Sequence, residues 1–244
     1  MQITICDSYE NMSEKAAQMI AEQINNKPDS VLGLATGSTP LGLYKMLVDM
    51  NAKKEVDFSK VISFNLDEYY PMKQSDKNSY FTYMLDNFFS QVNMERNNIH
   101  MLRGDTDNPE AECEIYEKQI SDCGGIDLQI LGLGNNGHIG FNEPNKIMEL
   151  QTHITKLHTS TIMANSRFFN SVEDVPKYAL TMGIATIFSA KKIVIMASGI
   201  EKKKIISEMF NNSVNTSIPA TLLKLHNNTV LLCDHRACCD LLYC

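Results

Sequence analysis

The sequence predicts an α/β fold: one doubly wound, mostly parallel sheet with helices on both faces, formed by a single domain over residues 1–244. Segments with apolar residues at helical spacing alternate with short apolar segments along the chain. The segment IDLQILGLG, from Ile126, is apolar almost throughout, which is typical of strands that a parallel sheet buries on both faces. No internal repeat, low-complexity tract or linker rich in Pro and Gly divides the chain, so a single domain is expected.

Each element is expected from its own pattern. Helices are predicted where apolar residues recur every three or four positions, and strands where a short apolar segment stands alone. The helix after VLGLA is expected to have Thr39 as its N-cap and Pro40 in its first turn, because a hydroxyl and a fixed φ suit these positions. The expected strands are 2–6, 31–35, 61–66, 126–134, 192–198 and 228–234, and the expected helices are 9–26, 39–50, 78–92, 109–122, 178–189 and 201–210. The irregular segment 146–174 is a candidate lid.

The composition limits the classes of partner. A formal net charge of −7 argues against nucleic acid, because binding to phosphate backbones requires a basic face. No segment approaches the roughly 18 consecutive apolar residues of a membrane span. The N-terminus lacks a basic region followed by an apolar stretch, so we expect neither a membrane protein nor a secreted one.

The cysteines indicate a reducing compartment. There are 7 of them, an odd number, and they are scattered along the chain, whereas a disulfide framework would be even and denser. We therefore expect a cytoplasmic protein. The tail CDHRACCDLLYC, from Cys233, is a metal candidate because it combines four thiols with His235. It contains no CxxC spacing, and adjacent cysteines such as Cys238 and Cys239 suit a tetrahedral site poorly, so we expect reduced thiols and no metal.

Three of the expected strands end in polar segments that could bind a ligand. VLGLA leads into TGSTP from Thr36, VISFNL leads into Asp67 and Glu68, and IDLQILGLG leads into a loop that contains His138 and Glu143. Parallel strands place their carboxyl ends at one edge of a sheet, where α/β folds bind ligands. We therefore expect the three segments to converge on one site.

The segment TGSTP predicts a phosphate site. Gly37, Ser38 and Thr39 bring backbone N–H groups and hydroxyls to the start of a helix, where the partial positive charge favours an anion. An ordinary strand-to-helix turn with a threonine cap is the alternative. Neither GxxxxGK[ST] nor GxGxxG is present, so a phosphorylated small molecule is favoured over a nucleotide.

Asp67, His138 and Glu143 are candidates for acid–base catalysis. His138 lies in a loop with glycines at 132, 134, 137 and 140, a density typical of backbone that approaches a ligand closely. Histidine ionises near neutral pH, and Glu143 could orient it. Asp67 could move a proton between neighbouring carbons, or it could cap the next helix. The chain has no nucleophile elbow and no HExxH motif.

Four segments together resemble the glucosamine-6-phosphate deaminases: TGSTP, FNLDEYY from Phe64, GNNGHIGFNEP from Gly134 and NSRFF from Asn165. The resemblance continues through VPKYALTMG, from Val175, and covers essentially the whole chain. It implies a Rossmann-like fold of the sugar-phosphate isomerase type. It also implies the conversion of glucosamine 6-phosphate and water to fructose 6-phosphate and ammonia in amino-sugar catabolism, with no metal or organic cofactor.

The resemblance also implies roles for the catalytic candidates. His138 matches the residue that opens the sugar ring, and Glu143 matches the carboxylate that pairs with it. Asp67 matches the base that takes the C2 proton and returns it at C1. Many family members carry an Asp where this chain has Asn136, so here the histidine has one carboxylate partner and at most an amide on the other side. We expect a different pH profile from this substitution.

The phosphate site carries over as well. Gly37, Ser38 and Thr39 match the family's phosphate loop, while Arg167 and Lys202 match two cationic clamps. A guanidinium fork and an ammonium can together neutralise a phosphate dianion. Without the resemblance, both cations would be interpreted as solvated surface residues.

A second departure concerns regulation. Family members activated by N-acetylglucosamine 6-phosphate bind it at a subunit interface with an Arg and a Lys, where this chain has His153 and Thr155. Lys156 could compensate if the segment shifts. We expect no activation by this compound, hyperbolic kinetics, and a monomer or small homo-oligomer.

Rival interpretations remain at this stage. A 6-phosphogluconolactonase or a ribose-5-phosphate isomerase would share the fold, and a sugar-phosphate sensor could use the same pocket without catalysis. The DEY segment at Asp67 and the GHIGFNEP loop favour the deaminase, and all three acid–base candidates are present.

Overall fold

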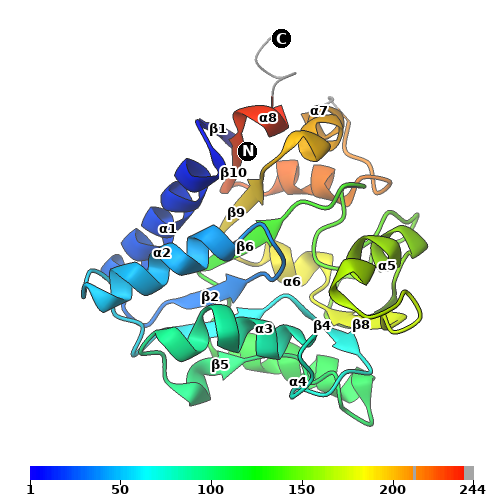
Figure 1. Ribbon diagram of the computed structural model, residues 1–244, viewed down its shortest axis with the longest axis horizontal. Coiled ribbons are helices and arrows are strands. Elements are labelled where there is room, and N and C mark those ends of the chain that lie inside the picture. Colours follow the sequence, from blue (N-terminus) through cyan, green and yellow to red (C-terminus); the bar gives the residue numbers. More distant parts are fainter. Residues whose placement is uncertain (211–212, 239–244) are drawn as a thin grey trace.

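A seven-stranded sheet forms the centre of the protein, whose structure, a computed structural model, describes residues 1–210 and 213–238 (Figure 1). The strand order is β1-β10-β9-β6-β2-β3-β5, and all neighbouring strands in it run parallel. The predicted doubly wound, mostly parallel sheet is therefore confirmed. The strand bounds are β1 Gln2–Cys6, β2 Val31–Leu34, β3 Ile62–Asn65, β5 Ile99–His100, β6 Leu128–Gly132, β9 Lys192–Ala197 and β10 Thr229–Asp234.

Helices alternate with these strands. α1 and α2 lie side by side against the near face of the sheet in Figure 1, and their buried positions recur at helical spacing. The bounds are α1 Tyr9–Asn26, α2 Leu41–Ala52, α3 Tyr80–Asn87, α4 Pro109–Asp122, α5 Thr159–Asn165, α6 Ile184–Phe188, α7 Lys203–Phe210 and α8 His235–Cys238. Within the described residues, none of these helices has the length and apolar character that crossing a bilayer requires.

The direction of the chain across the sheet reverses between β2 and β6. From β2 the chain moves outward through β3 to β5, then returns to place β6 on the other side of β2 and continues through β9 and β10. At such a switch point the loops leaving two neighbouring strands turn to opposite faces of the sheet and open a crevice. A ligand crevice is therefore expected at the carboxyl ends of β2 and β6.

A second, antiparallel sheet lies beside this crevice and was not predicted. Its order is β4-β8-β7, with β4 at Asp67–Tyr70, β7 at His153–Lys156 and β8 at Tyr178–Thr181. The predicted helix 178–189 is wrong over its first half, because residues 178–181 pair with both neighbouring strands. Gly183 then permits the chain to turn into α6, since a Cβ there would lie 2.2 Å from the carbonyl oxygen of Gln151. Tertiary pairing thus overrides local propensity.

Other boundaries also differ from the prediction. The segment 146–174 is not wholly irregular, because it contains β7, α5 and a 3-10 turn at Ser166–Phe168. The predicted helix 78–92 is shorter, with Ser79 capping α3 and a separate 3-10 turn following it. The N-cap of α2 is Pro40 rather than Thr39, and no side chain caps that end.

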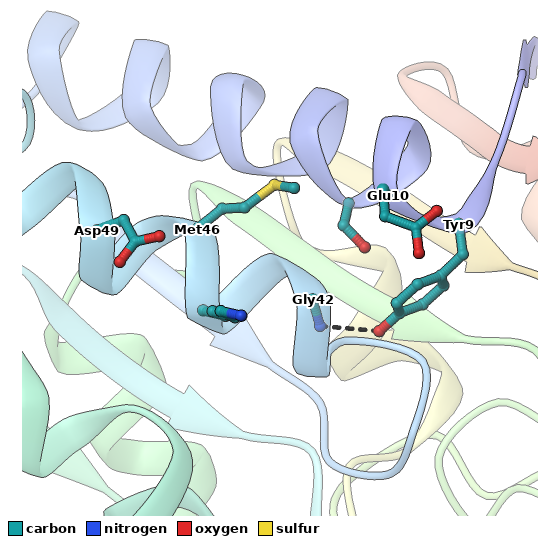
Figure 2. Close-up of a pocket in the computed structure, with 7 residues that line it drawn as sticks. Tyr9, Glu10, Gly42, Met46 and Asp49 are labelled. Atoms are coloured by element: carbon teal, nitrogen blue, oxygen red, sulfur yellow. Dashed lines mark hydrogen bonds between the residues drawn. The ribbon is translucent and has the colours of Figure 1, made fainter.

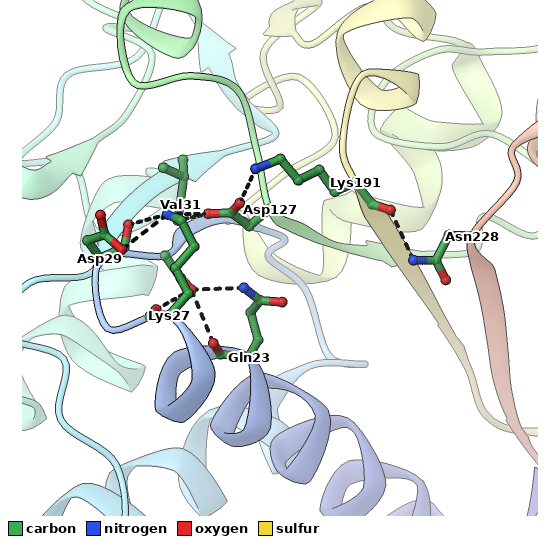
Figure 3. A network of polar contacts seen from close by, with 8 residues as sticks. Gln23, Lys27, Asp29, Val31, Asp127, Lys191 and Asn228 are labelled. Atoms are coloured by element: carbon green, nitrogen blue, oxygen red, sulfur yellow. Dashed lines mark hydrogen bonds and ion pairs between the residues drawn. The ribbon is translucent and has the colours of Figure 1, made fainter.

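Asp127 joins three elements at the edge of the sheet opposite the crevice (Figure 3). Its carboxylate lies 2.9 Å from Nζ of Lys27 and 2.7 Å from Nζ of Lys191, and it accepts the amide of Val31 at 2.8 Å. The Asp127 side chain is only 3% exposed. Burial opposes its ionisation, but the hydrogen bonds from Lys191, Val31 and Lys27 outweigh burial and lower the pKa of Asp127.

Replacing Asp127 with Asn should destabilise the protein by roughly 1–3 kcal/mol, because hydrogen bonds to a buried charge are lost. The folded-state pKa lies below the ordinary value, so this contribution is present above the unfolded-state pKa and is lost as pH falls through the folded-state pKa. The difference in unfolding free energy should therefore be full at neutral pH and should shrink below about pH 4. Urea unfolding at several pH values measures it. Asp29→Asn is the matched control, since Asp29 also pairs with Lys27 but is 74% exposed. Equal effects of the two substitutions would contradict the prediction.

Candidate active site

Four neighbouring strands of the main sheet deliver the predicted site residues to one edge. In sheet order these strands are β9, β6, β2 and β3. The segments that follow them contain Lys202, the His138 loop, the Ser38 loop and Asp67. In Figure 1, α5, β4 and β8 lie together on the side toward which β2 and β6 point. The convergence expected from the sequence is what this topology provides.

Asp67 is the first residue of β4, two residues beyond the end of β3 at Asn65. Its side chain is buried, and it pairs with Thr181 of β8. A Cβ on Gly140 would lie 3.5 Å from its Oδ2, so the His138 loop passes directly beside the carboxyl group. Burial and, to a smaller extent, the neighbouring charge of Glu68 raise the pKa of Asp67 to about 8. Asp67 is therefore a carboxyl group held ready to exchange a proton near neutral pH.

Glu68, next to Asp67, fixes β4 against α3. Its carboxylate accepts the amides of Tyr69 at 2.9 Å, Tyr80 at 2.9 Å and Phe81 at 3.0 Å, so it binds the first turn of α3. Burial raises the pKa of Glu68 despite these hydrogen bonds. The helix-binding role weighed for Asp67 is thus performed by Glu68, which leaves the carboxyl group of Asp67 available.

The His138 loop has its shape because of its glycines. A Cβ on Gly134 would lie 2.4 Å from Nε2 of the imidazole, so only glycine leaves room for the ring. Gly137 has a φ of +83°, a conformation that L side chains rarely adopt. The amide of His138 donates to Oδ1 of Asn136 at 3.1 Å, and its Nδ1 lies 3.4 Å from Oε2 of Glu143. The ring is 24% exposed, so it can reach a ligand.

Glu143 is a buried carboxylate held by polar groups on both oxygens. Nδ2 of Asn136 donates to Oε2 at 2.8 Å, and the hydroxyl of Thr161 donates to Oε1. Burial opposes ionisation, but the interactions with His138, Thr161 and Asn136 outweigh burial and lower the pKa of Glu143 to about 2. Glu143 is therefore ionised at neutral pH and can stabilise positive charge on His138.

Asn136 contacts Glu143 and the backbone of His138, and it does so with both ends of its amide group. A carboxylate at position 136 could accept the His138 amide but could not donate to Glu143, and its charge would repel that of Glu143. The substitution noted in the sequence therefore leaves Glu143 as the carboxylate that pairs with the imidazole.

The phosphate-loop candidates lie where β2 ends, and tyrosine hydroxyls fix their carbonyl groups. Tyr83 donates to the carbonyl oxygen of Gly37 at 2.6 Å, and Tyr9 lies within hydrogen-bond distance of the carbonyls of Ser38 (3.2 Å) and Thr39 (3.1 Å). Gly37 has a φ of +95°, and open space lies where its Cβ would be. Among the described residues, no acceptor is bonded to the amides of residues 37–39. The loop thus presents N–H groups to a ligand.

Tyr9 also links this loop to the helices behind it. Its hydroxyl accepts the amide of Gly42 at 2.8 Å (Figure 2). The groove around it, of about 290 Å³, runs between α1 and α2 and is lined by Glu10, Met46 and Asp49 as well. None of the predicted site residues lines this groove. Tyr9 thus connects Ser38 and Thr39 to the first turn of α2.

Lys202 and Arg167 approach the crevice from different segments. Nζ of Lys202 donates to Oδ1 of Asn135 at 2.5 Å, which ties it to the His138 loop. Burial lowers the pKa of Lys202; Glu201 opposes this, and the charge of Arg167 lowers the pKa further. Arg167 is exposed, with its guanidinium 4.7 Å from the ring of Phe168. Two cations that repel each other in this way would be stabilised by an anion between them.

Sequence reasoning missed several residues of this site. Glu68 had only its position beside Asp67 as a signal, and Tyr9, Tyr83 and Thr161 had none, because each contacts a distant segment. The cysteine-rich tail that was considered as a metal site is described only in part, because Cys239 and Cys244 lie outside the described residues. Within the described residues, no group of three or more His, Cys, Asp or Glu side chains could hold a metal ion.

The sequence matches a family model described as glucosamine-6-phosphate isomerases/6-phosphogluconolactonase over residues 7–232. A glucosamine-6-phosphate deaminase of Clostridium botulinum (strain Loch Maree / Type A3) is 51% identical over 237 residues, which are 97% of each chain. One from Thermoanaerobacter sp. (strain X514) is 49% identical, over 97% of this chain and 94% of the other.

Solved structures agree with these matches. A monomeric glucosamine-6-phosphate deaminase superposes with a TM-score of 0.95 at 40% identity, covering 97% of this chain and 98% of the other. A 6-phosphogluconolactonase from Thermotoga maritima has a TM-score of 0.76 at 20% identity, covering 96% and 99%, and shows the shared fold alone. The resemblance seen in four sequence segments is confirmed: the chain belongs to the glucosamine-6-phosphate isomerase/6-phosphogluconolactonase family.

Proposed function

We propose that the chain converts glucosamine 6-phosphate and water to fructose 6-phosphate and ammonia. One observation carries the proposal: two carboxyl groups beside the same loop are held in opposite protonation states. Burial raises the pKa of Asp67 to about 8, whereas hydrogen bonds and His138 lower that of Glu143 to about 2. With these pKa values, Asp67 can transfer a proton near neutral pH while Glu143 stays an anion. The relatives named as deaminases, which are 51% and 49% identical in sequence to this chain, support the same reaction.

The substrate phosphate is proposed to bind at the loop of Gly37, Ser38 and Thr39. Its N–H groups and hydroxyls would donate to the phosphate oxygens. Arg167 would add a bidentate contact and Lys202 a point charge. This end of the substrate fixes the sugar so that its reacting carbons lie near Asp67 and its ring oxygen near His138.

Ring opening is proposed to use the pair of His138 and Glu143. The imidazole moves a proton between the anomeric hydroxyl and the ring oxygen, and the bond from C1 to the ring oxygen breaks to leave an open-chain aldehyde. The charge of Glu143 stabilises the imidazolium that forms on the way. The adjacent amine and the new aldehyde then acidify the proton on C2.

Asp67 is proposed to move that proton. Its carboxyl group is mostly protonated at pH 7 in the free protein, and the cationic amine on C2 would favour the ionised form when substrate binds. The carboxylate takes the proton from C2 while a proton of the cationic amine moves to O1, giving an enolamine, and Asp67 then returns its proton to C1. This leaves an imine at C2; water adds there, the C–N bond breaks, and ammonia departs with fructose 6-phosphate as the other product.

Ammonia release from glucosamine 6-phosphate by the purified chain, without added metal, tests the proposal. A coupled assay for fructose 6-phosphate should give equal amounts of both products. The lactone of 6-phosphogluconate and ribose 5-phosphate serve as alternative substrates in parallel reactions. Hydrolysis of the lactone without ammonia release from the amino sugar would favour the other branch of the family. Complete inactivation by a chelator, reversed by zinc, would overturn the metal-free mechanism.

We further propose that the protein is a cytoplasmic monomer or small homo-oligomer without activation by N-acetylglucosamine 6-phosphate. The place where activated relatives are expected to bind the compound holds His153 in a groove of about 460 Å³ between α4 and β7. Four glutamates also line this groove (residues 110, 114, 117 and 149), so a phosphate dianion would meet like charge there. The monomeric deaminase structure supports the small assembly.

Substrate titrations with and without N-acetylglucosamine 6-phosphate should therefore be hyperbolic and superimposable. An activator must bind one state of the protein better than another, and the acidic groove offers a phosphate no such contact. Light scattering on the same sample measures the mass. A sigmoidal curve that the compound makes hyperbolic would refute the regulatory prediction, and a hexamer mass would refute the assembly.

A further inference from the structure

We infer that Thr161 is a positioning residue that couples the 146–174 segment to the acid–base pair of Glu143 and His138. Its hydroxyl donates to Oε1 of Glu143 from the first turn of α5. The catalytic consequence rests on the function proposed above. The physical coupling between α5 and Glu143 does not.

The two oxygens of Glu143 have different partners. Oε2 accepts the amide of Asn136 and lies 3.4 Å from Nδ1 of His138, while Oε1 accepts the hydroxyl of Thr161. A carboxylate bonded on both oxygens cannot rotate freely about its terminal torsion. Thr161 therefore fixes the direction in which Oε2 faces the imidazole.

Thr161 differs from its neighbours on α5. It is 5% exposed, whereas Ser160, one position earlier, is exposed to solvent. A threonine in a helix can bond the carbonyl four residues earlier in the chain, but the hydroxyl of Thr161 reaches across 18 positions to Glu143. The buried hydroxyl thus has the carboxylate of Glu143 as its acceptor instead of a carbonyl of its own helix.

Apolar contacts hold α5 in the same place. Ile162 and Phe169 pack against a small cluster that includes Tyr69 and Phe141, separate from the main core. The ring of Phe169 lies 5.7 Å from that of Tyr69, which follows Asp67 on β4 by two positions. The segment is thus packed between the strand of the proposed base and the carboxylate that orients the histidine.

Movement of α5 would consequently change the chemistry of Glu143. The carboxylate is buried, and a buried anion that loses a donor is strongly destabilised. Loss of the Thr161 contact would raise the pKa of Glu143, because that contact is one of the interactions that lower it. It would also leave the carboxylate held on Oε2 alone, by Asn136, so that its orientation toward His138 would be less fixed. The pair is therefore fully assembled only while α5 is docked.

Thr161→Val tests the inference, because it removes the hydroxyl and keeps the shape. We expect kcat to fall by roughly 10- to 100-fold, the range expected for a lost hydrogen bond to a charged group. KM should change little, because the phosphate contacts are untouched. A further loss of activity at low pH, separate from the limb set by Asp67, should appear at higher pH than in the wild type as the pKa of Glu143 rises. Thr161→Ser should restore both, and Ser160→Ala is the matched control on the same turn.

A second measurement needs no activity. The rate of hydrogen exchange of the amides in 159–169 should increase in Thr161→Val and in Glu143→Ala. The double variant should exchange no faster than either single variant, because the two substitutions break the same contact. Additive increases, or a Thr161→Val enzyme with the wild-type rate and pH profile, would overturn the inference. If the wild-type chain releases no ammonia, the proposed function fails, while the exchange experiment still decides the coupling.

Discussion

Asp67→Asn is expected to lower turnover by roughly 100- to 10,000-fold, the contribution typical of a positioned general base. An amide of the same size cannot accept the C2 proton. Substrate binding should change little, because the phosphate loop, Arg167 and Lys202 are intact in the variant. The loss should therefore appear in kcat rather than in binding.

Exchange of the C2 proton with deuterated solvent measures this step directly. Wild-type protein should exchange it during turnover and Asp67→Asn should not, while a phosphorylated sugar analogue binds both equally. Asp107→Asn, on an exposed loop, is the control for the substitution itself. Retained exchange at C2 in Asp67→Asn would show that another residue is the base.

Arg167→Ala is expected to raise KM by roughly 30- to 150-fold, which corresponds to the 2–3 kcal/mol of a charge-assisted contact to phosphate. The guanidinium is exposed, and its positive charge lowers the pKa of Lys202. A phosphate bound at both side chains would neutralise the two cations. Turnover at saturation should fall less, because the residue lies away from the reacting carbons in the proposed mechanism.

Inhibition by inorganic phosphate isolates the same contact. The inhibition constant of phosphate should rise in Arg167→Ala in parallel with KM. Arg167→Lys should recover only part of the lost affinity for phosphate, because an ammonium lacks the bidentate fork. Arg103→Ala is the control, since that arginine is also exposed and pairs with Asp105 instead. An unchanged KM would return Arg167 to the solvated surface.

The main sheet could be predicted because its strands carry their own signal. Each is a short apolar segment between helical patterns. The polar residues at the ends of β2, β3 and β6 could be interpreted as a ligand site because α/β folds bind ligands there. The meeting of Asp67 with the His138 loop needed only the parallel direction of the strands, which places their carboxyl ends at one edge of the sheet.

The second sheet could not be predicted in the same way. Tyr178–Thr181 is apolar and is followed by a short helix, so local pattern alone favours one continuous helix. Its strand conformation depends on pairing with Asp67–Tyr70 and His153–Lys156, which come from other parts of the chain. Such long-range pairing has no local sequence signature.

The polar contacts that support the site were hidden for a related reason. Tyr83 reaches Gly37 across 46 positions and Tyr9 reaches Thr39 across 30. A single hydroxyl carries no information about a partner so far away. The family resemblance supplied Arg167 and Lys202, whose own neighbourhoods gave no indication of a phosphate.

The bond between Lys202 and Asn135 bears on which sugars the proposed phosphate site would hold. An ammonium carries three N–H donors, and the amide oxygen of Asn135 accepts from one of them. The bond therefore directs the Lys202 side chain and leaves further donors for a second acceptor. A phosphate dianion would accept from them more strongly than the hydroxyl of an unphosphorylated hexosamine. The proposed site would thus favour a phosphorylated sugar over a free amino sugar, with Lys202 already held in place by its own chain.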